Sequence, residues 1–309
     1  SHISVVERFD EHLRQSDERG WDKPATAQDF DKFSDLLILD GQNTYNNYLA
    51  LIRYAYFAKN DEVYLAVLKL LDGAEALDNL YQRLAESIGE EKRDWVFSNK
   101  QPLPLGAPSE KKAQVMRQIM ERFEQSVEQE RCEEILGAGL RDLQDEWYRD
   151  AREKYLESEN LDAFITWKGD DFIAQLEKIM LEDSFFFNQK INQEVIDFVN
   201  SHPEIRQGVR EGNILYEAKI PYMAIEYLNT KDDQMKPYYY CHCPWARESL
   251  IGDNIPVSGT FCNCSAGYHK KYWEMVFDQP MQAEVLESVL QGDDWCLFAI
   301  HLPDDLEEI

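Results

Sequence analysis

The sequence predicts an α+β protein, in which a helical N-terminal domain is followed by helices packed on a four-stranded antiparallel sheet. The first observation is that apolar residues recur with a helical period as far as Gly212. The second is that apolar and polar residues then alternate, as they do in half-buried strands. Helices and strands that are segregated along a chain are typical of α+β domains, so the two observations together predict this fold class.

Residues 1–98 form the predicted helical domain. Their apolar side chains have helical spacing, for example at Phe30, Phe33, Leu36 and Leu37. Asp72-Gly73 interrupts a later apolar run, and Gly89 ends the next one. Aromatic residues at this spacing usually pack in a core, and we find no catalytic motif in this region.

Residues 99–112 are the predicted domain linker. They contain Pro102, Pro104 and Pro108. Proline cannot continue a helix, and several prolines in a short stretch make a semi-rigid spacer. We therefore expect a domain boundary here, with residues 113–309 forming a second domain of the α+β type.

The second domain is expected to begin with helices and to end with strands. Helices are predicted from Val115, over roughly 140–156, from about 170 and over about 193–199. Strands are predicted at 214–220, 236–243, 281–290 and 295–302, with a helix at 261–277 between the second and third. Gly292-Asp293-Asp294 is the predicted turn between the last two strands.

Composition excludes several classes of partner. The 309 residues carry 59 acidic and 32 basic side chains, a net charge of −27. Such a surface repels phosphate backbones and anionic lipids, so neither nucleic acid nor a membrane is an expected partner. No apolar stretch approaches the roughly 20 residues of a membrane span, and the N-terminus does not have the pattern of a secretion signal. We expect a cytoplasmic protein.

The strongest functional signal is a group of cysteines near the C-terminus. Cys241 and Cys243 would point to the same side of a strand, and Pro244 allows the backbone to bend towards a common ion. Cys262 and Cys264 would stand where the chain enters a helix, whose N-terminus lowers a thiol pKa. Four thiolates in a tetrahedron favour zinc, with an iron–sulfur cluster as the alternative. The competing interpretation is that these are ordinary buried thiols, which is how we interpret Cys132, and Cys296 when it is taken alone.

Other side chains near these cysteines are candidates for a ligand pocket. His242 would face away from its two neighbouring cysteines, into a pocket. His269 could be a metal ligand or a general base, although a surface position beside two lysines is the plainer interpretation. Tyr240, Tyr268 and Trp273 could line a pocket for a small apolar or aromatic molecule, or they could belong to the core.

The C-terminal pattern resembles the 4-vinyl reductase domain. The resemblance lies in Cys262, Gly267-Tyr268, an aromatic helix to Gln279-Pro280, a strand, and Gly292-Asp293-Asp294 before Cys296. It covers about 90 residues clearly and implies zinc ligands at Cys262 and Cys296. The family's usual Glu-x-x-Cys is replaced here by Val285 and Ser288, so we expect Cys264, Cys241 and Cys243 to complete the ligand set. A related family of vesicle-tethering subunits dimerises through its helices, which implies a possible homodimer.

A second resemblance suggests an alternative function. The run from Tyr238 to Glu248 looks like a bacterial subgroup of unknown function, and it is similar to L-2-amino-thiazoline-4-carboxylic acid hydrolases. We predict a small-molecule-binding protein with a cysteine-rich zinc site. The alternative is a zinc- or cysteine-dependent hydrolase of a small cyclic amidine or amide-like substrate. The sequence contains no phosphate-binding glycine loop and no nucleophile elbow.

Overall fold

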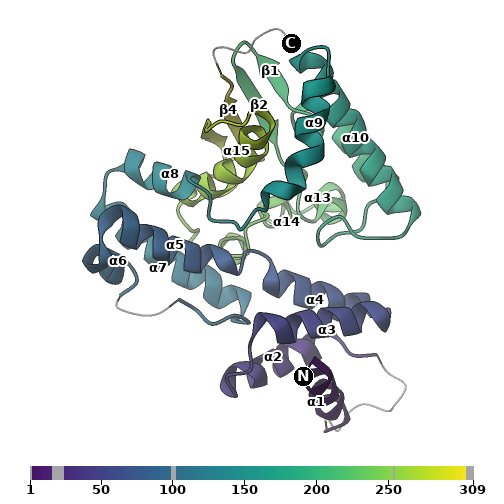
Figure 1. Ribbon diagram of the computed structural model, residues 1–309. Coiled ribbons are helices and arrows are strands. Elements are labelled where there is room, and N and C mark those ends of the chain that lie inside the picture. The colour runs from purple at the N-terminus through teal and green to yellow at the C-terminus, as the bar shows by residue number, and fades with distance from the viewer. Residues whose placement is uncertain (1, 16–23, 99–101, 253–254, 304–309) are drawn as a thin grey trace.

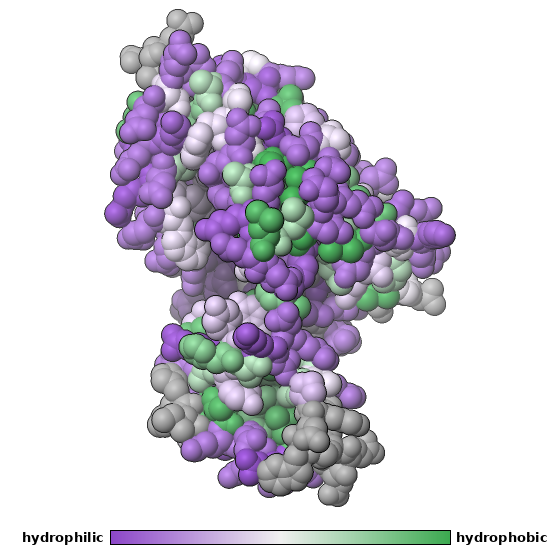
Figure 2. Space-filling view, turned by 90° about the vertical axis from the view of Figure 1, so that its right-hand side faces the viewer, coloured by the Kyte–Doolittle hydropathy of each residue, from purple (hydrophilic) through white to green (hydrophobic). Residues whose placement is uncertain are grey.

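The computed structural model describes residues 2–15, 24–98, 102–252 and 255–303, and it confirms the α+β fold class (Figure 1). Helices predominate, and four strands form one antiparallel sheet. Residues 99–101 of the predicted linker lie outside the described residues. Within the described ranges, no helix is both long and apolar enough to cross a bilayer. Most of the face shown in Figure 2 is hydrophilic, in keeping with the net charge of −27.

The first body of the structure is a group of four helices: α1 (His2–Gln15), α2 (Ala27–Leu39), α3 (Tyr45–Phe57) and α4 (Asp61–Leu71). Three of them begin at polar N-cap side chains, because Thr26, Thr44 and Asn60 each accept a hydrogen bond from the backbone N–H three residues on. Their apolar faces enclose one core that includes Phe9, Phe33 and Leu51.

A second body crosses the middle of the molecule in Figure 1. It contains α5 (Glu75–Ile88), α6 (Glu90–Val96), α7 (Ser109–Ser126) and α8 (Gln129–Gly137). Residues on both sides of the predicted linker share its core, where Leu80 and Val96 pack in the same cluster as Met120 and Leu136. The division between cores therefore falls at Asp72-Gly73, between α4 and α5, and not at 99–112. Residues 109–112 already belong to helix α7.

The sheet and its helices form the third body. The helices are α9 (Arg149–Glu157), α10 (Leu161–Leu181), α11 (Gln193–Ser201), α12 (Pro203–Arg206), α13 (Ala224–Asn229), α14 (Lys236–Tyr240) and α15 (Asn263–Phe277). Short 3₁₀ helices occupy Asp145–Tyr148, Arg247–Leu250 and Gly259–Cys262. The strands are β1 (Val209–Glu211), β2 (Ile214–Ala218), β3 (Gln282–Glu287) and β4 (Leu297–His301), in the spatial order β1-β2-β4-β3.

One of the predicted strands is wrong. Residues 236–243 form helix α14 and an irregular segment, since Pro237 occupies the first turn of a helix, where a missing N–H costs nothing. The fourth strand of the sheet is instead β1, which pairs with β2 across a turn at Gly212-Asn213. Gly212 has a φ of 60°, the left-handed conformation that such a turn needs. The predicted strands at 214–220, 281–290 and 295–302 are present with shorter bounds.

The sheet is covered on both faces. Leu215 and Ile300 are directly paired across β2 and β4, and they pack with Phe164 of α10 and Trp273 of α15. Side chains that point to the other face of the sheet, such as Ala218 and Leu297, pack with Val195 and Val199 of α11. Because successive side chains point to opposite faces, each strand contributes to two cores. The α15 face carries the groups described next.

Candidate functional site

The five C-terminal cysteines lie in one interior region, which we call the thiol cluster: Cys241, Cys243, Cys262, Cys264 and Cys296. Cys241 and Cys243 follow α14, Cys262 and Cys264 flank the start of α15, and Cys296 precedes β4. All five are free thiols. Cys132 is also free, but it is buried in the core beside α7, where its thiol faces the carbonyl of Phe123. The fold thus brings cysteines from three separate stretches of the chain into one region.

Two members of the cluster, Cys262 and Cys296, contact the hydroxyl of Ser288, and Cys241 interacts electrostatically with both thiols. Burial raises the pKa of Cys262, and negative charge at Cys296 or Cys241 raises it further. Burial also raises the pKa of Cys241, and negative charge at Cys296 raises it further. Ser288, fully buried, lies 2.8 Å from Cys262 between Oγ and Sγ, and it also hydrogen-bonds the thiol of Cys296. Ser288 therefore occupies a corner of the cluster where a further ligand would be expected.

The prediction of low thiol pKa values is wrong for this structure. Burial raises the pKa of Cys243 to about 12, and it also raises the pKa of Cys264 and of Cys262. Cys262 is still inside a 3₁₀ helix, and Cys264 lies within the first turn of α15, but loss of solvent outweighs any effect of the helix dipole. The thiols are therefore protonated at neutral pH.

The cluster is not a ready-made metal site. Among the described residues, no three His, Cys, Asp or Glu side chains stand close enough together to hold one metal ion. The five sulfur atoms share a region without surrounding a common point. A metal would have to displace thiol protons and draw the side chains inward.

His242 is half-buried, and one side of its ring already has a hydrogen-bond partner. Its Nε2–H donates to the carbonyl oxygen of Ile220 at 2.6 Å, and its ring packs edge-on against Tyr222. Burial lowers the pKa of His242 to about 3, so the ring is neutral. It lies in the same interior region as the thiols without lining either cavity described below.

His269 is not the surface residue that its two lysine neighbours suggested. Its Nδ1 lies 3.0 Å from Oε2 of Glu217, and its ring stacks on Phe298 with centroids 4.7 Å apart. Glu217 and Phe298 are directly paired across β2 and β4, so they point to the same face of the sheet. Helix α15 packs on that face and places His269 above both.

Glu217 is the centre of a buried polar network that the sequence analysis missed. Its Oε1 accepts hydrogen bonds from Lys168 Nζ at 2.6 Å and from Trp273 Nε1 at 3.1 Å. Burial alone would raise the pKa of Glu217, but Lys168 and His269 outweigh it and lower the pKa to about 2. The sequence did contain one sign of this network. Glu217 lies two residues after the apolar Leu215, so both side chains point to the same face of a strand that is covered on both faces.

The hydrogen bond to Glu217 assigns the protonation of His269. An ionised carboxylate only accepts, so Nδ1 carries the hydrogen and Nε2 carries a lone pair. Burial lowers the pKa of His269, which keeps the ring neutral. Nε2 is buried and has no hydrogen-bond partner among the described residues. A carboxylate-oriented imidazole with a free lone pair is suited to accept a proton or to bind a metal.

Lys219 connects the histidines with the thiols. Its Nζ donates to Ser265 Oγ at 2.9 Å and lies 5.7 Å from the ring centroid of Phe298. After burial, its positive charge is the largest influence that lowers the pKa of His242. The same charge also acts on the thiols of Cys243 and Cys296. Sequence analysis missed this residue because a lysine at a strand end is usually solvated.

The three aromatic candidates are packed in place. Tyr240 is buried and donates to the carbonyl oxygen of Lys219 at 2.6 Å, and Trp273 is completely buried beside Glu217. Tyr268 is half-buried, and burial raises its pKa. None of the three lines the cavities described next.

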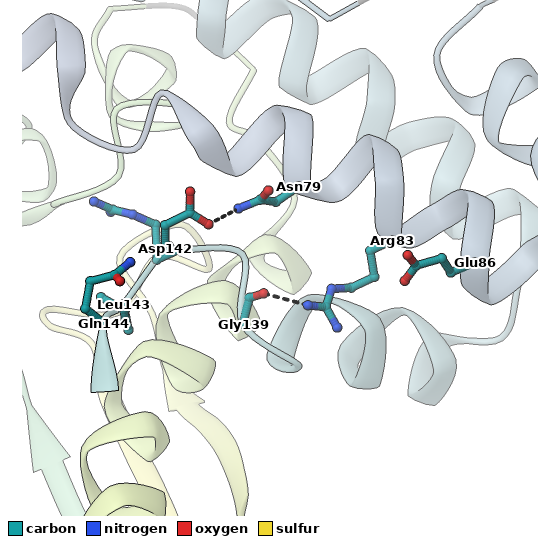
Figure 3. Close-up of a pocket in the computed structure, with 8 residues that line it drawn as sticks. Asn79, Arg83, Glu86, Gly139, Asp142, Leu143 and Gln144 are labelled. Atoms are coloured by element: carbon teal, nitrogen blue, oxygen red, sulfur yellow. Dashed lines mark hydrogen bonds between the residues drawn. The ribbon is translucent and has the colours of Figure 1, made fainter. Parts of the chain in front are cut away.

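Two cavities lie beside the segment that follows α8. Figure 3 shows the smaller, of about 390 Å³, where α5 faces this segment and where Asn79 bonds Asp142 and Arg83 bonds the carbonyl of Gly139. The larger, of about 550 Å³, reaches from the end of α4 to Trp245. Arg141 borders both cavities, and no member of the thiol cluster lines either one.

Comparison with known proteins gives one match. Residues 224–306 match a family of unknown function, DUF6144. No curated protein and no solved structure matches the chain. The matched stretch runs from α13 through β4 and includes all five members of the thiol cluster, so the chain is similar to this family over the region that holds the candidate site.

Proposed function

We propose that residues 214–302 form a small-molecule-binding domain of the 4-vinyl-reductase-like type, and that its thiol cluster takes up a zinc ion. The observation that carries the proposal is the convergence of five free thiols from three separate stretches in one interior region. Soft thiolate ligands favour zinc over hard cations. An iron–sulfur cluster uses the same ligands and is the alternative outcome of the metal analysis.

Cys241, Cys262 and Cys296 are the thiols that would hold the metal. Cys262 and Cys296 both contact Ser288, which stands where the resembling family has a cysteine, and Cys241 interacts electrostatically with both thiols. Zinc binding would release the thiol protons, so affinity should rise with pH. His269 Nε2 is a further candidate metal ligand, because Glu217 orients the ring and that nitrogen has no hydrogen-bond partner within the described ranges.

The metal is tested with protein purified without chelator. We expect about one zinc per chain by elemental analysis, and uptake by stripped protein that strengthens from pH 7 to pH 8. The double variant Cys262→Ser/Cys296→Ser should lose uptake. Cys132→Ser is the matched control, because it removes a buried thiol outside the cluster. Absence of stoichiometric metal, or equal uptake by both variants, would contradict the proposal.

The small-molecule part of the proposal is tested separately by native mass spectrometry. The interior polar groups that a ligand could meet are the ammonium of Lys219, a donor, and Nε2 of His269, an acceptor, set among apolar groups such as Phe298. We expect retained mass of a small apolar or aromatic compound in freshly purified protein, lost after mild denaturation. Spectra that show only chain and metal would remove this part and leave the zinc site standing.

The second candidate function is hydrolysis, and the His269–Glu217 pair is the observation that favours it. An oriented neutral imidazole can act as a general base. The raised thiol pKa values favour a metal-bound water as nucleophile over a cysteine. Iodoacetamide at pH 7 discriminates between the two, because one fast-reacting thiol would support a cysteine nucleophile. Uniformly slow reaction would leave only the zinc-dependent form.

We also infer a reducing, cytoplasmic environment and a possible homodimer. The free thiols support the first inference, because clustered cysteines in oxidising compartments usually pair. The second rests on the resemblance to dimeric tethering subunits. Sedimentation at several concentrations tests it, and a mass equal to one chain throughout would remove it.

A further inference from the structure

The larger cavity lies where the three bodies of the protein meet, outside the thiol cluster. It has a volume of about 550 Å³ and is bordered by the end of α4, the start of α5, residues 103–106, the start of α7 and residues 141–147. Ligand sites commonly occur at such junctions and have volumes of about 300–1,000 Å³. Its size and position therefore suit a small organic molecule.

The walls combine apolar groups with two cations, Lys112 and Arg141, and three carboxylates, Glu75, Asp78 and Asp142. Leu71, Leu105 and two tryptophans, Trp147 and Trp245, supply the apolar surface. Trp245 is held in place, because its Nε1 donates to the carbonyl oxygen of Gly73 at 2.7 Å. Trp147 is 66% exposed, so its ring is accessible from solvent at the border of the cavity. Tryptophan at the border of a cavity is suited to stack on a planar ligand.

The first cation, Arg141, is already neutralised. It forms ion pairs with Asp72 and Glu75, each at 2.8 Å. Both carboxylates are thus engaged, and Arg141 serves to tie the segment after α8 to the junction between α4 and α5. It does not require a further anion.

The second cation, Lys112, has no such partner. It is 3% exposed, and its Nζ donates to the carbonyl oxygen of Leu70 at 3.2 Å and lies 5.4 Å from the ring centroid of Trp245. Among the described residues it forms no ion pair. Its charged surroundings are Asp72, which Arg141 already holds, together with Lys69 and Arg247. Burial lowers the pKa of Lys112 to about 8.

A buried ammonium without a counter-ion is costly, and proteins normally pair such a charge. Acidic side chains are abundant in a chain with a net charge of −27, yet none of those that the structure describes forms an ion pair with Lys112. The missing partner is consistent with an anion that is supplied by a ligand.

We propose that this cavity binds a small aromatic monocarboxylate, whose carboxylate accepts a hydrogen bond from Lys112 and whose ring lies against Trp245 and Trp147. A single charge fits better than a phosphate, because Lys112 offers one unpaired cation and Glu75 and Asp78 also border the cavity. This site is distinct from the thiol cluster and does not depend on the metal.

The test is calorimetric titration of the full chain with 2-naphthoate and with its neutral analogue, 2-naphthamide. A charge-assisted hydrogen bond contributes about 1.5–3 kcal/mol, so the acid should bind roughly 10-fold or more tightly than the amide. Lys112→Met should remove this preference, and Lys112→Arg should keep part of it. Equal affinity of the wild-type chain for acid and amide, or a preference that survives in Lys112→Met, would overturn the proposal.

Two further variants keep the test decisive if Lys112→Met does not fold. Trp147→Ala removes an exposed wall residue and should weaken naphthoate binding several-fold, whereas Trp95→Ala, at an exposed tryptophan outside the cavity, should not. Equal effects of the two would count against the site. Cys262→Ser should leave naphthoate binding unchanged, and a loss there would place the ligand at the thiol cluster and overturn the inference.

Discussion

Removing Lys168 should expose how much of the stability of the third body depends on the Glu217 network. The perturbation is Lys168→Met, which keeps the aliphatic length and deletes the ammonium that bonds Glu217 at 2.6 Å. The carboxylate would remain 5% exposed, with hydrogen bonds only from Trp273 and the neutral His269. Breaking a buried pair from one side typically costs about 3–5 kcal/mol.

The pKa of Glu217 gives a second value for the loss of stability expected in Lys168→Met. A pKa lowered from 4.5 to about 2 means that ionised Glu217 stabilises the fold by roughly 3 kcal/mol, at about 1.4 kcal/mol per pH unit. Because the folded pKa lies below the unfolded one, this contribution is complete above pH 4.5 and disappears as the pH falls towards 2. Lys168→Met should therefore cost most at pH 7, and the gap to the wild type should narrow below pH 4.5.

The assay is urea unfolding followed by tryptophan fluorescence at pH 7 and pH 3, combined with hydrogen exchange of β2 and α15. Lys178→Met is the matched control on the same helix, because its ion pair with Glu182, at 4.0 Å, is exposed and should contribute less than about 0.5 kcal/mol. The double variant Lys168→Met/Glu217→Gln should recover part of the loss. Equal unfolding midpoints for Lys168→Met and Lys178→Met at pH 7 would refute the reasoning.

Three further substitutions test packing, capping and the joint between bodies, each read as a change in unfolding free energy. Gly267→Ala should cost about 1–3 kcal/mol, because its Cβ would stand 2.6 Å from the carbonyl oxygen of Gly137. The control Gly137→Ala meets only an ordinary contact and should be nearly neutral. Equal effects of the two substitutions would contradict this prediction. Thr26→Ala removes the capping box of α2 and should cost about 0.5–2 kcal/mol, and an unchanged midpoint would argue against the cap. Trp245→Phe deletes the N–H that satisfies the carbonyl of Gly73 and should cost about 1–3 kcal/mol; a stabilised variant would contradict this.

The sequence was sufficient for the fold class and for the elements with strong periodicity. The helix at 261–277 and the strands at 214–220 and 295–302 were found because their apolar residues repeat regularly. The predicted strand at 236–243 failed because three consecutive tyrosines suit a strand by propensity, while Pro237 and packing against α13 select a helical turn. Strand β1 has only three residues, too few for a period to be visible.

The candidate site was predicted in part. The convergence of the cysteines followed from their Cys-x-Cys spacing and from the resemblance, but their protonation did not, because burial is a property of the folded chain. Lys168 and Glu217 are 49 residues apart in the chain. Their pairing depends on how α10 packs against β2, which no local pattern encodes. The same holds for Lys112, whose burial becomes visible only in three dimensions.

The indole of Trp245 joins Gly73, at the division between the first two cores, to the stretch of chain that carries Cys243. Any rotation of the four N-terminal helices about that glycine must either break this hydrogen bond or drag the cysteine-bearing backbone with it. Trp245 is one of several side chains that couple the N-terminal helices to the rest of the protein, since Lys112 donates to the carbonyl of Leu70 and Lys69 pairs with Glu248.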